Sequence, residues 1–131
     1  MKQNQREHVS REAASKAGRC LKTSKGHDEQ ALATAQAWRV QHLEPTARCF
    51  EALARCAGQF KGAVVSYRLK RMTSILRKLL RLNSNFKLGT LDDIGGCRLI
   101  VSSVDEVYRA VAVLNEELGE WKAKDYISRP Q

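Results

Sequence analysis

The sequence lacks any run of about 18 apolar residues, the shortest length that spans a membrane as a helix. Its first stretch, MKQNQREHVSREAASK, also lacks the apolar segment of a secretory signal peptide. We therefore expect a cytoplasmic protein that makes no contact with a membrane. At 131 residues and 43% hydrophobic content, the chain has the size and the apolar side chains to form one domain with a buried core.

Metal-binding patterns of cysteine and histidine are absent as well. The four cysteines form no C-x-x-C pair and have no flanking histidines at zinc-ligand spacing, which excludes a structural zinc site of the common kinds. None of the three histidines has a partner at catalytic spacing. In a reducing compartment we expect the cysteines to be unpaired, small core residues. They are Cys20, Cys49, Cys56 and Cys97.

Acidic residues are missing from the whole interval between Glu51 and Asp92. This basic segment, residues 52–91, contains nine lysines and arginines, whereas the rest of the chain has fourteen bases against fourteen acids, so the segment carries the entire net charge of +9. A phosphate-rich ligand or a nucleic acid is the expected partner. A solvated basic helix face is the ordinary alternative.

The first half of the chain has helix-forming composition. Residues 1–27 are polar and predicted to be partly flexible, with a short helix over Glu12–Leu21. Residues 28–62 predict a helical hairpin, in which Asp28 is the N-cap of the first helix and Pro45 lies in the first turn of the second.

A second part, residues 63–131, is predicted to begin with a continuous helix over VVSYRLKRMTSILRKLLRL, residues 64–82. Its apolar stripe would be Met72, Ile75, Leu76, Leu79 and Leu82, opposite the polar stripe Lys70, Ser74, Arg77, Lys78 and Arg81. Arg68 falls on the apolar side of this projection, which means either that the helix begins later or that this side chain points elsewhere.

After a loop at residues 83–90 the pattern changes to that of a short buried strand, CRLIV, residues 97–101. Ser103 and Glu106 form a capping box for a helix that Gly119 ends, and WKAKDYI, residues 121–127, indicates a second strand. Strand, helix and strand at this spacing predict a βαβ unit with parallel strands. The fold class is therefore α/β, in the broad α+β sense, with a helical N-terminal half.

Three motifs in this order resemble the synthetase domain of the RelA/SpoT family: RLKRMTSILRKLLR, LDDIGGCRLIV and DYISRP. The family makes the alarmones guanosine tetra- and pentaphosphate. The resemblance runs from about Asp28 to the last residue and implies a nucleotidyltransferase-like fold. It also implies that ATP is bound by the residues that match the donor motifs, namely Arg68, Lys70, Ser74, Arg77, Lys78 and Arg98.

Asp93 matches the family's metal-binding aspartate, so the resemblance implies that Asp93 is catalytic and holds Mg²⁺. Asp92 is a poor substitute, because adjacent residues of an extended backbone point in opposite directions. Gly95 and Gly96 would give phosphates close access to the backbone. The ordinary alternatives are a turn leading into a strand, and an Arg98 that pairs with Asp92 or Asp93.

The implied reaction transfers diphosphate from ATP to the 3′ hydroxyl of GDP or GTP, which is the reaction of a GTP pyrophosphokinase in the stringent response. The family's acceptor motif and second carboxylate would follow Gln131, so we expect a C-terminally truncated domain, without its last strands, whose turnover is impaired. Three alternatives stay open: an enzyme acting on tRNA, one acting on adenine nucleotides, and a non-catalytic RNA-binding or regulatory protein. Oligomeric state is open too, homo-oligomers included.

Overall fold

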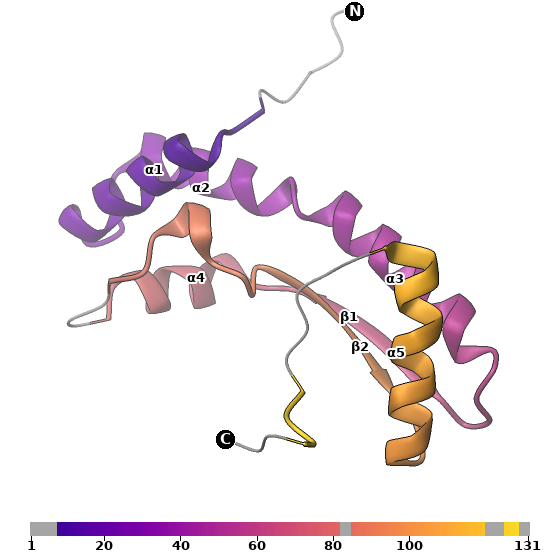
Figure 1. Ribbon diagram of the computed structural model, residues 1–131. Coiled ribbons are helices and arrows are strands. Elements are labelled where there is room, and N and C mark those ends of the chain that lie inside the picture. The colour runs from indigo at the N-terminus through magenta and orange to yellow at the C-terminus, as the bar shows by residue number, and fades with distance from the viewer. Residues whose placement is uncertain (1–7, 82–84, 120–124, 129–131) are drawn as a thin grey trace, which may run out of the picture. The chain divides into compact units, whose positions relative to one another are not determined.

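The computed structural model describes residues 8–81, 85–119 and 125–128 (Figure 1). In chain order the elements are α1 (Arg11–Thr23), α2 (Glu29–Val40), α3 (Leu43–Ala57), β1 (Val64–Leu69), α4 (Met72–Leu79), a 3-10 turn η1 (Leu88–Thr90), β2 (Gly95–Ile100) and α5 (Val104–Leu118). The predicted α+β class is confirmed, although the sheet consists of two antiparallel strands, β1 and β2. No helix among the described residues is long and apolar enough to cross a membrane.

Helix starts follow the capping residues that the sequence predicts. Asp28 accepts a hydrogen bond from the backbone N–H of Ala31 at 3.0 Å and begins α2, and Ser103 accepts one from Glu106 at 3.2 Å and begins α5. Pro45 lies in the first turn of α3. Each cap satisfies a backbone donor that has no partner within its helix, which is why these starts are readable from sequence.

The chain divides into two compact units. The first unit comprises Met1–Arg48 and Tyr67–Cys97, and the second comprises Cys49–Ser66 and Arg98–Gln131. In the first unit α1 packs against α2, α4 and η1. The core of this unit consists of Val9, Ala14, Ala17, Leu21, Ala31, Ala35, Ile75, Leu79, Leu88 and Ile94. Small residues on α1 and α2 allow close packing, and the larger residues of α4, η1 and Ile94 fill the remaining space.

A glycine permits the close approach of η1 to α1. The Gly89 N–H donates to Ser15 Oγ at 3.1 Å, and a Cβ atom at Gly89 would collide with the Arg11 carbonyl and the Ser15 side chain. This contact holds the segment before β2 against the core of the first unit, and so it restricts where Asp93 can lie.

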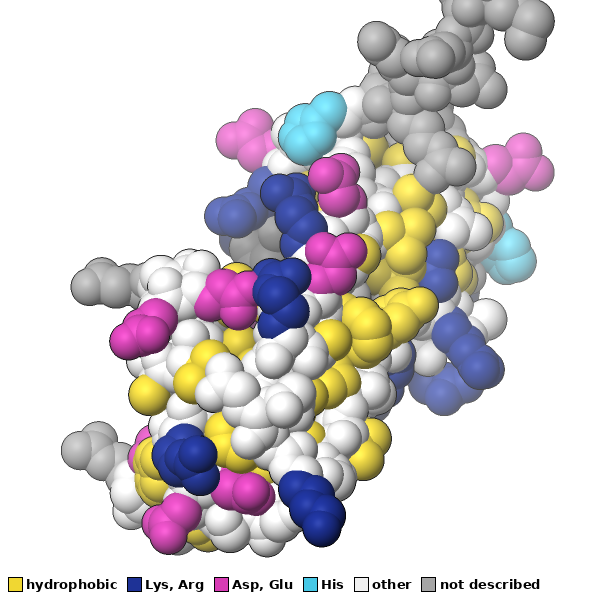
Figure 2. Space-filling view, turned by 90° about the vertical axis from the view of Figure 1, so that its right-hand side faces the viewer, with side chains coloured by type: hydrophobic (Ala, Val, Ile, Leu, Met, Phe, Trp, Pro, Cys, Tyr) yellow, Lys and Arg dark blue, Asp and Glu magenta, His cyan; other side chains and the backbone are white. Residues whose placement is uncertain are grey.

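In the second unit the buried residues come from the end of α3, from the turn after it and from α5: Ala52, Leu53, Cys56, Phe60, Ala110 and Leu114. Arg109 lies over the Phe60 ring, 5.2 Å from its centroid, and Arg55 forms an ion pair with Glu117. On α5 the side chains of Ala110 and Leu114 are buried, whereas those of Val104 and Leu118, at the two ends of the helix, are exposed. On the face drawn in Figure 2, acidic and basic side chains are interspersed.

The prediction of one continuous helix over residues 64–82 is wrong in its first part. Residues 64–69 form β1, and the helix begins only at Met72 after the extended backbone of Arg71. The β-branched pair Val64 and Val65 and the aromatic Tyr67 favour a strand. From Met72 onward the predicted stripe is correct, since Ile75 and Leu79 are buried, while Leu82 lies outside the described residues.

The predicted strand after α5 lies partly outside the described residues, at 121–124. Its last part, Asp125–Ile127, is a turn instead. The Asp125 carboxylate accepts hydrogen bonds from the backbone N–H groups of Ile127 and Ser128 at 2.9 and 3.0 Å, a local pattern that competes with strand pairing. The partner of β2 is therefore β1, which precedes it in the chain, and the pair is antiparallel.

Candidate functional site

A pocket of about 590 Å³ lies where β1 ends and α4 begins, within the first unit. Among the residues that the structure describes, its lining includes six bases and no acid: Arg68, Leu69, Lys70, Arg71, Ser74, Arg77, Lys78 and Arg81. Five of the six residues assigned to nucleotide binding from the sequence are among them. This volume is typical of a small-molecule site, and the lining favours an anion.

The pocket side of α4 follows from helical spacing. Ser74, Arg77 and Lys78 are separated by three and four residues, so they share one face, while Ile75 and Leu79 are fully buried on the other. Arg68 comes from β1 instead. Because Arg68 lies on a strand and not on the helix, it does not follow the helical stripe. It lines the pocket from β1, whereas Ser74, Arg77 and Lys78 line it from α4.

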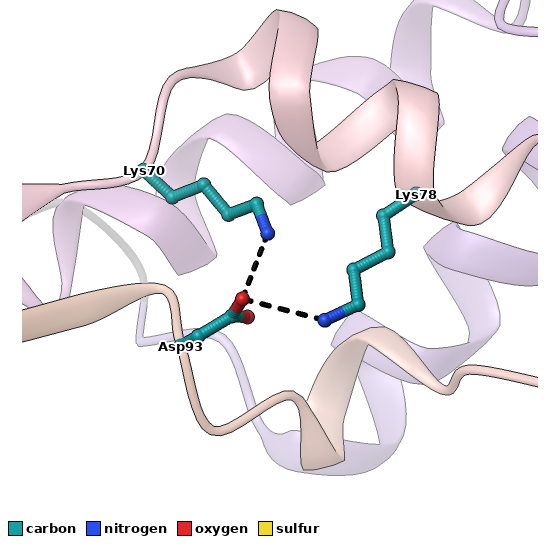
Figure 3. Close-up of polar contacts among 3 residues, drawn as sticks. All are labelled: Lys70, Lys78 and Asp93. Atoms are coloured by element: carbon teal, nitrogen blue, oxygen red, sulfur yellow. Dashed lines mark hydrogen bonds and ion pairs between the residues drawn. The ribbon is translucent and has the colours of Figure 1, made fainter.

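Two pocket lysines converge on Asp93 (Figure 3). Lys70 Nζ lies 2.8 Å from Asp93 Oδ2, and Lys78 Nζ lies 3.3 Å from the same oxygen. The lysine side chains are 14% and 22% exposed, whereas that of Asp93 is 44% exposed. The hydrogen bond from Lys70 is the main cause that lowers the pKa of Asp93. The bond from Lys78 and both positive charges add to this effect, and together they outweigh the opposing effect of burial.

The backbone of Lys70 is fixed on both sides. Its N–H donates to the Ile94 carbonyl at 2.7 Å, and its own carbonyl accepts from Arg39 Nε at 2.7 Å. Arg39 lies on α2, 31 residues earlier in the chain, and no sequence pattern pointed to its role. Because Ile94 is fully buried, these bonds tie Lys70 and Asp93 to the core.

The two neighbouring carboxylates have different surroundings. Asp93 makes the ion pairs with the pocket lysines, while Asp92 is exposed. Arg98 is exposed on β2, in the second unit, and does not belong to the described lining of the pocket. Asp93 pairs with Lys70 and Lys78, rather than with the arginine of the alternative interpretation.

The paired glycines before Cys97 have separate roles. A Cβ atom at Gly95 would collide with the Thr46 side chain, so this glycine is needed for packing against α3. A Cβ atom at Gly96 would meet no described atom within 4 Å, so this position is open. The prediction that the glycines expose backbone to phosphate consequently applies to Gly96 at most, and for Gly95 packing is the physical reason.

For a metal ion, the described part of the pocket's surroundings offers one carboxylate, that of Asp93. Among the residues that the structure describes, no three His, Cys, Asp or Glu side chains gather where they could hold a metal. Mg²⁺ in nucleotide enzymes is commonly bound by one or two carboxylates together with substrate phosphates. Asp93, at the edge of a pocket for anions, fits an ion of that kind, which would be held jointly by the carboxylate and by the phosphates of a nucleotide.

A strand and a helix that meet at a basic pocket, with one carboxylate at its edge, define an α+β domain suited to binding a polyphosphate. Residues 67–131 match the family model described as a region found in RelA / SpoT proteins. Over that part of the chain, which contains the whole pocket, the match is consistent with a synthetase domain of the RelA/SpoT family, and it indicates a function of the (p)ppGpp synthetase kind. No curated protein matches the chain.

Proposed function

We propose that the pocket binds the triphosphate of ATP and that the domain transfers diphosphate from ATP to the 3′ hydroxyl of GDP or GTP. The observation that supports this most directly is the pocket itself, where six bases and a serine surround about 590 Å³ with no acid in the described lining. A triphosphate is a compact, multiply charged anion, and several fixed bases are what it needs for binding.

The pocket residues divide by chemistry. Lys70 and Lys78 supply point charges that follow phosphate oxygens, while Arg68 and Arg77 can donate two parallel hydrogen bonds to one phosphate group. The Ser74 hydroxyl can donate to another oxygen. The family motif assigns Arg98, on β2, to nucleotide binding, and this role is a prediction.

In the proposed reaction the 3′ hydroxyl of the acceptor loses its proton to water, and its oxygen forms a bond with the β-phosphorus of ATP. The bond from that phosphorus to the oxygen bridging to the α-phosphate breaks, and AMP leaves with this oxygen. Phosphoryl transfer of this type depends mainly on positioning and charge neutralisation. Bound Mg²⁺ would neutralise phosphate charge, with Asp93 as its protein ligand, and the pocket bases hold the donor in line.

The acceptor is tested by a transfer assay with ATP carrying a labelled γ-phosphate, in the presence of Mg²⁺. GDP, GTP, an adenine nucleotide and tRNA are offered in parallel. Labelled guanosine tetra- or pentaphosphate is the expected product. Label that appears only in tRNA or in the adenine nucleotide would overturn the proposed acceptor.

Saturable ATP binding without transfer to any acceptor would overturn the enzymatic part of the proposal and leave a donor-binding domain. Salt-sensitive binding of RNA in the absence of ATP binding would favour the non-catalytic alternative instead. The Lys61→Ala variant is the matched control, because Lys61 is an exposed base of the basic segment that lies outside the pocket. We expect it to retain the wild-type product pattern.

A further inference from the structure

Asp93 occupies the place of an anion between two lysines. Lys70 and Lys78 both direct their ammonium groups at one oxygen, Asp93 Oδ2, at 2.8 and 3.3 Å. A phosphate oxygen accepts charge-assisted hydrogen bonds from lysines over the same range of distances. The carboxylate therefore makes the contacts that a phosphate group in this pocket would make.

Without a ligand, the pocket needs a negative charge to compensate its bases. Six bases line it, and the side chains of Lys70 and Lys78 are mostly buried, so their charges repel one another with little screening by water. Asp93 is the acid that the structure places against them. It compensates these two positive charges with a single carboxylate while no ligand is bound.

The geometry also allows Asp93 to leave. Its side chain is 44% exposed, so a rotated carboxylate reaches solvent, where its charge is stable. The lysine that it contacts most closely stays in place, because the Lys70 backbone is bonded to Ile94 and Arg39. Exchange of one anion for another thus requires rotation of a side chain and no rearrangement of β1 or α4.

We propose that Asp93 is an internal counter-anion of the empty pocket, which the triphosphate displaces from Lys70 and Lys78 when it binds. The proposal rests on the proposed function, in which this pocket takes the nucleotide. Its consequence is that Asp93 opposes binding of the bare triphosphate, and that the displaced carboxylate becomes free for Mg²⁺ carried by the nucleotide. The site would thereby favour the magnesium complex over the free nucleotide.

Removing the charge of Asp93 separates these two effects. We expect Asp93→Asn to bind inorganic triphosphate without metal about fivefold or more tightly than the wild type, since it loses a competitor for both lysines. With Mg²⁺ and ATP the same variant is expected to bind more weakly than the wild type. Asp92→Asn is the matched control: it removes the same charge from the adjacent exposed position and should change metal-free affinity by less than about twofold near 0.15 M salt.

Calorimetry of the three chains decides between the outcomes. If the wild type binds triphosphate but Asp93→Asn binds it no more tightly without metal, the role of Asp93 as counter-anion is overturned and the proposed function stands. The counter-anion is overturned equally if Asp92→Asn tightens binding as much as Asp93→Asn does. If neither the wild type nor Asp93→Asn binds triphosphate or ATP, the proposed function and this inference both fall.

A second measurement needs no substitution. In a crystal structure of the wild-type chain with metal-free inorganic triphosphate, we expect phosphate oxygens at about 3 Å from the Nζ atoms of Lys70 and Lys78. Asp93 is expected to lie beyond ion-pair distance from both lysines. A triphosphate bound in the pocket with Asp93 still on Lys70 and Lys78 would overturn the exchange.

Discussion

Basic side chains serve different purposes in the two units of this protein. In the second unit Arg55 pairs with Glu117, and Arg109 lies over the Phe60 ring, so both cations join α5 to the end of α3 or to the turn after it. In the first unit six bases surround one pocket, and Asp93 is the acid that pairs with two of them. A cluster of bases with too few acids therefore indicates a ligand-binding site. A base that has its own partner indicates a structural role.

The largest expected effect concerns the core that supports the pocket. Ile75, on α4, is fully buried, and Ile75→Ala should lower the free energy of unfolding by about 2 to 5 kcal/mol through lost burial and a cavity. Denaturant unfolding followed by circular dichroism measures this. The control is Ile100→Ala, the same change at a side chain that is 51% exposed, which should cost about 1 kcal/mol or less. Equal losses would contradict the assignment of the core to α4.

Removing charges in each unit tests the comparison directly. The double variant Lys70→Ala with Lys78→Ala should lose ATP affinity by about a hundredfold or more, because each of the two charge-assisted bonds contributes about 1.5 kcal/mol or more. The matched variant Arg55→Ala with Arg109→Ala loses the same net charge and should keep its affinity within about twofold. Isothermal titration calorimetry provides both values. Equal effects would mean that only the net charge attracts the nucleotide.

Arg39 is a positioning residue, with a smaller expected effect. Arg39→Ala removes the donor to the Lys70 carbonyl and should weaken ATP binding about threefold to tenfold, since a lost bond of this kind costs about 1 kcal/mol. Arg19→Ala, at an exposed base on α1, should leave the affinity unchanged. Arg39→Lys, which can still donate to the carbonyl, should recover part of the affinity. A role in stability alone would lower the unfolding temperature of Arg39→Ala without weakening ATP binding by the folded protein.

The smallest effect concerns a thiol of the second unit. Burial raises the pKa of Cys56, and the charge of Glu117 adds to the increase. Because the neutral thiol is favoured in the folded state, its contribution to stability is complete below the ordinary thiol pKa of about 8.5 and declines as the pH rises through the raised value. Alkylation by iodoacetamide at pH 8 should therefore be slower at Cys56 than at the half-buried Cys49. Faster labelling of Cys56 would contradict its burial.

Local sequence signals predicted much of this fold. Ser103 with Glu106, and Asp28 before α2, are caps whose partners lie three residues away, so the sequence alone defines them. Ile75 and Leu79 repeat at helical spacing and are buried as expected. The strand β1 was missed because its residues Val64–Leu69 run directly into a periodic helix, and the only warning was the position of Arg68 off the helical stripe.

The site was predictable only as far as its residues are neighbours in sequence or match a family motif. Lys70, Ser74, Arg77 and Lys78 lie close in the chain and line one pocket. The bond from Arg39 to Lys70 joins positions 31 residues apart, and that from Lys70 to Asp93 joins positions 23 apart. Such contacts depend on how helices pack, which hydrophobic periodicity does not encode.

The central claim, that the basic pocket of the first unit is the nucleotide site, is tested most directly by nuclear magnetic resonance. ATP with Mg²⁺ is titrated into the ¹⁵N-labelled chain, and the amide shifts are mapped onto the sequence. We predict saturable shifts that gather at residues 68–81 and at Asp93, while α5 is unaffected. Saturable shifts confined to α5 and the end of α3, or no saturable shift at all, would contradict the account.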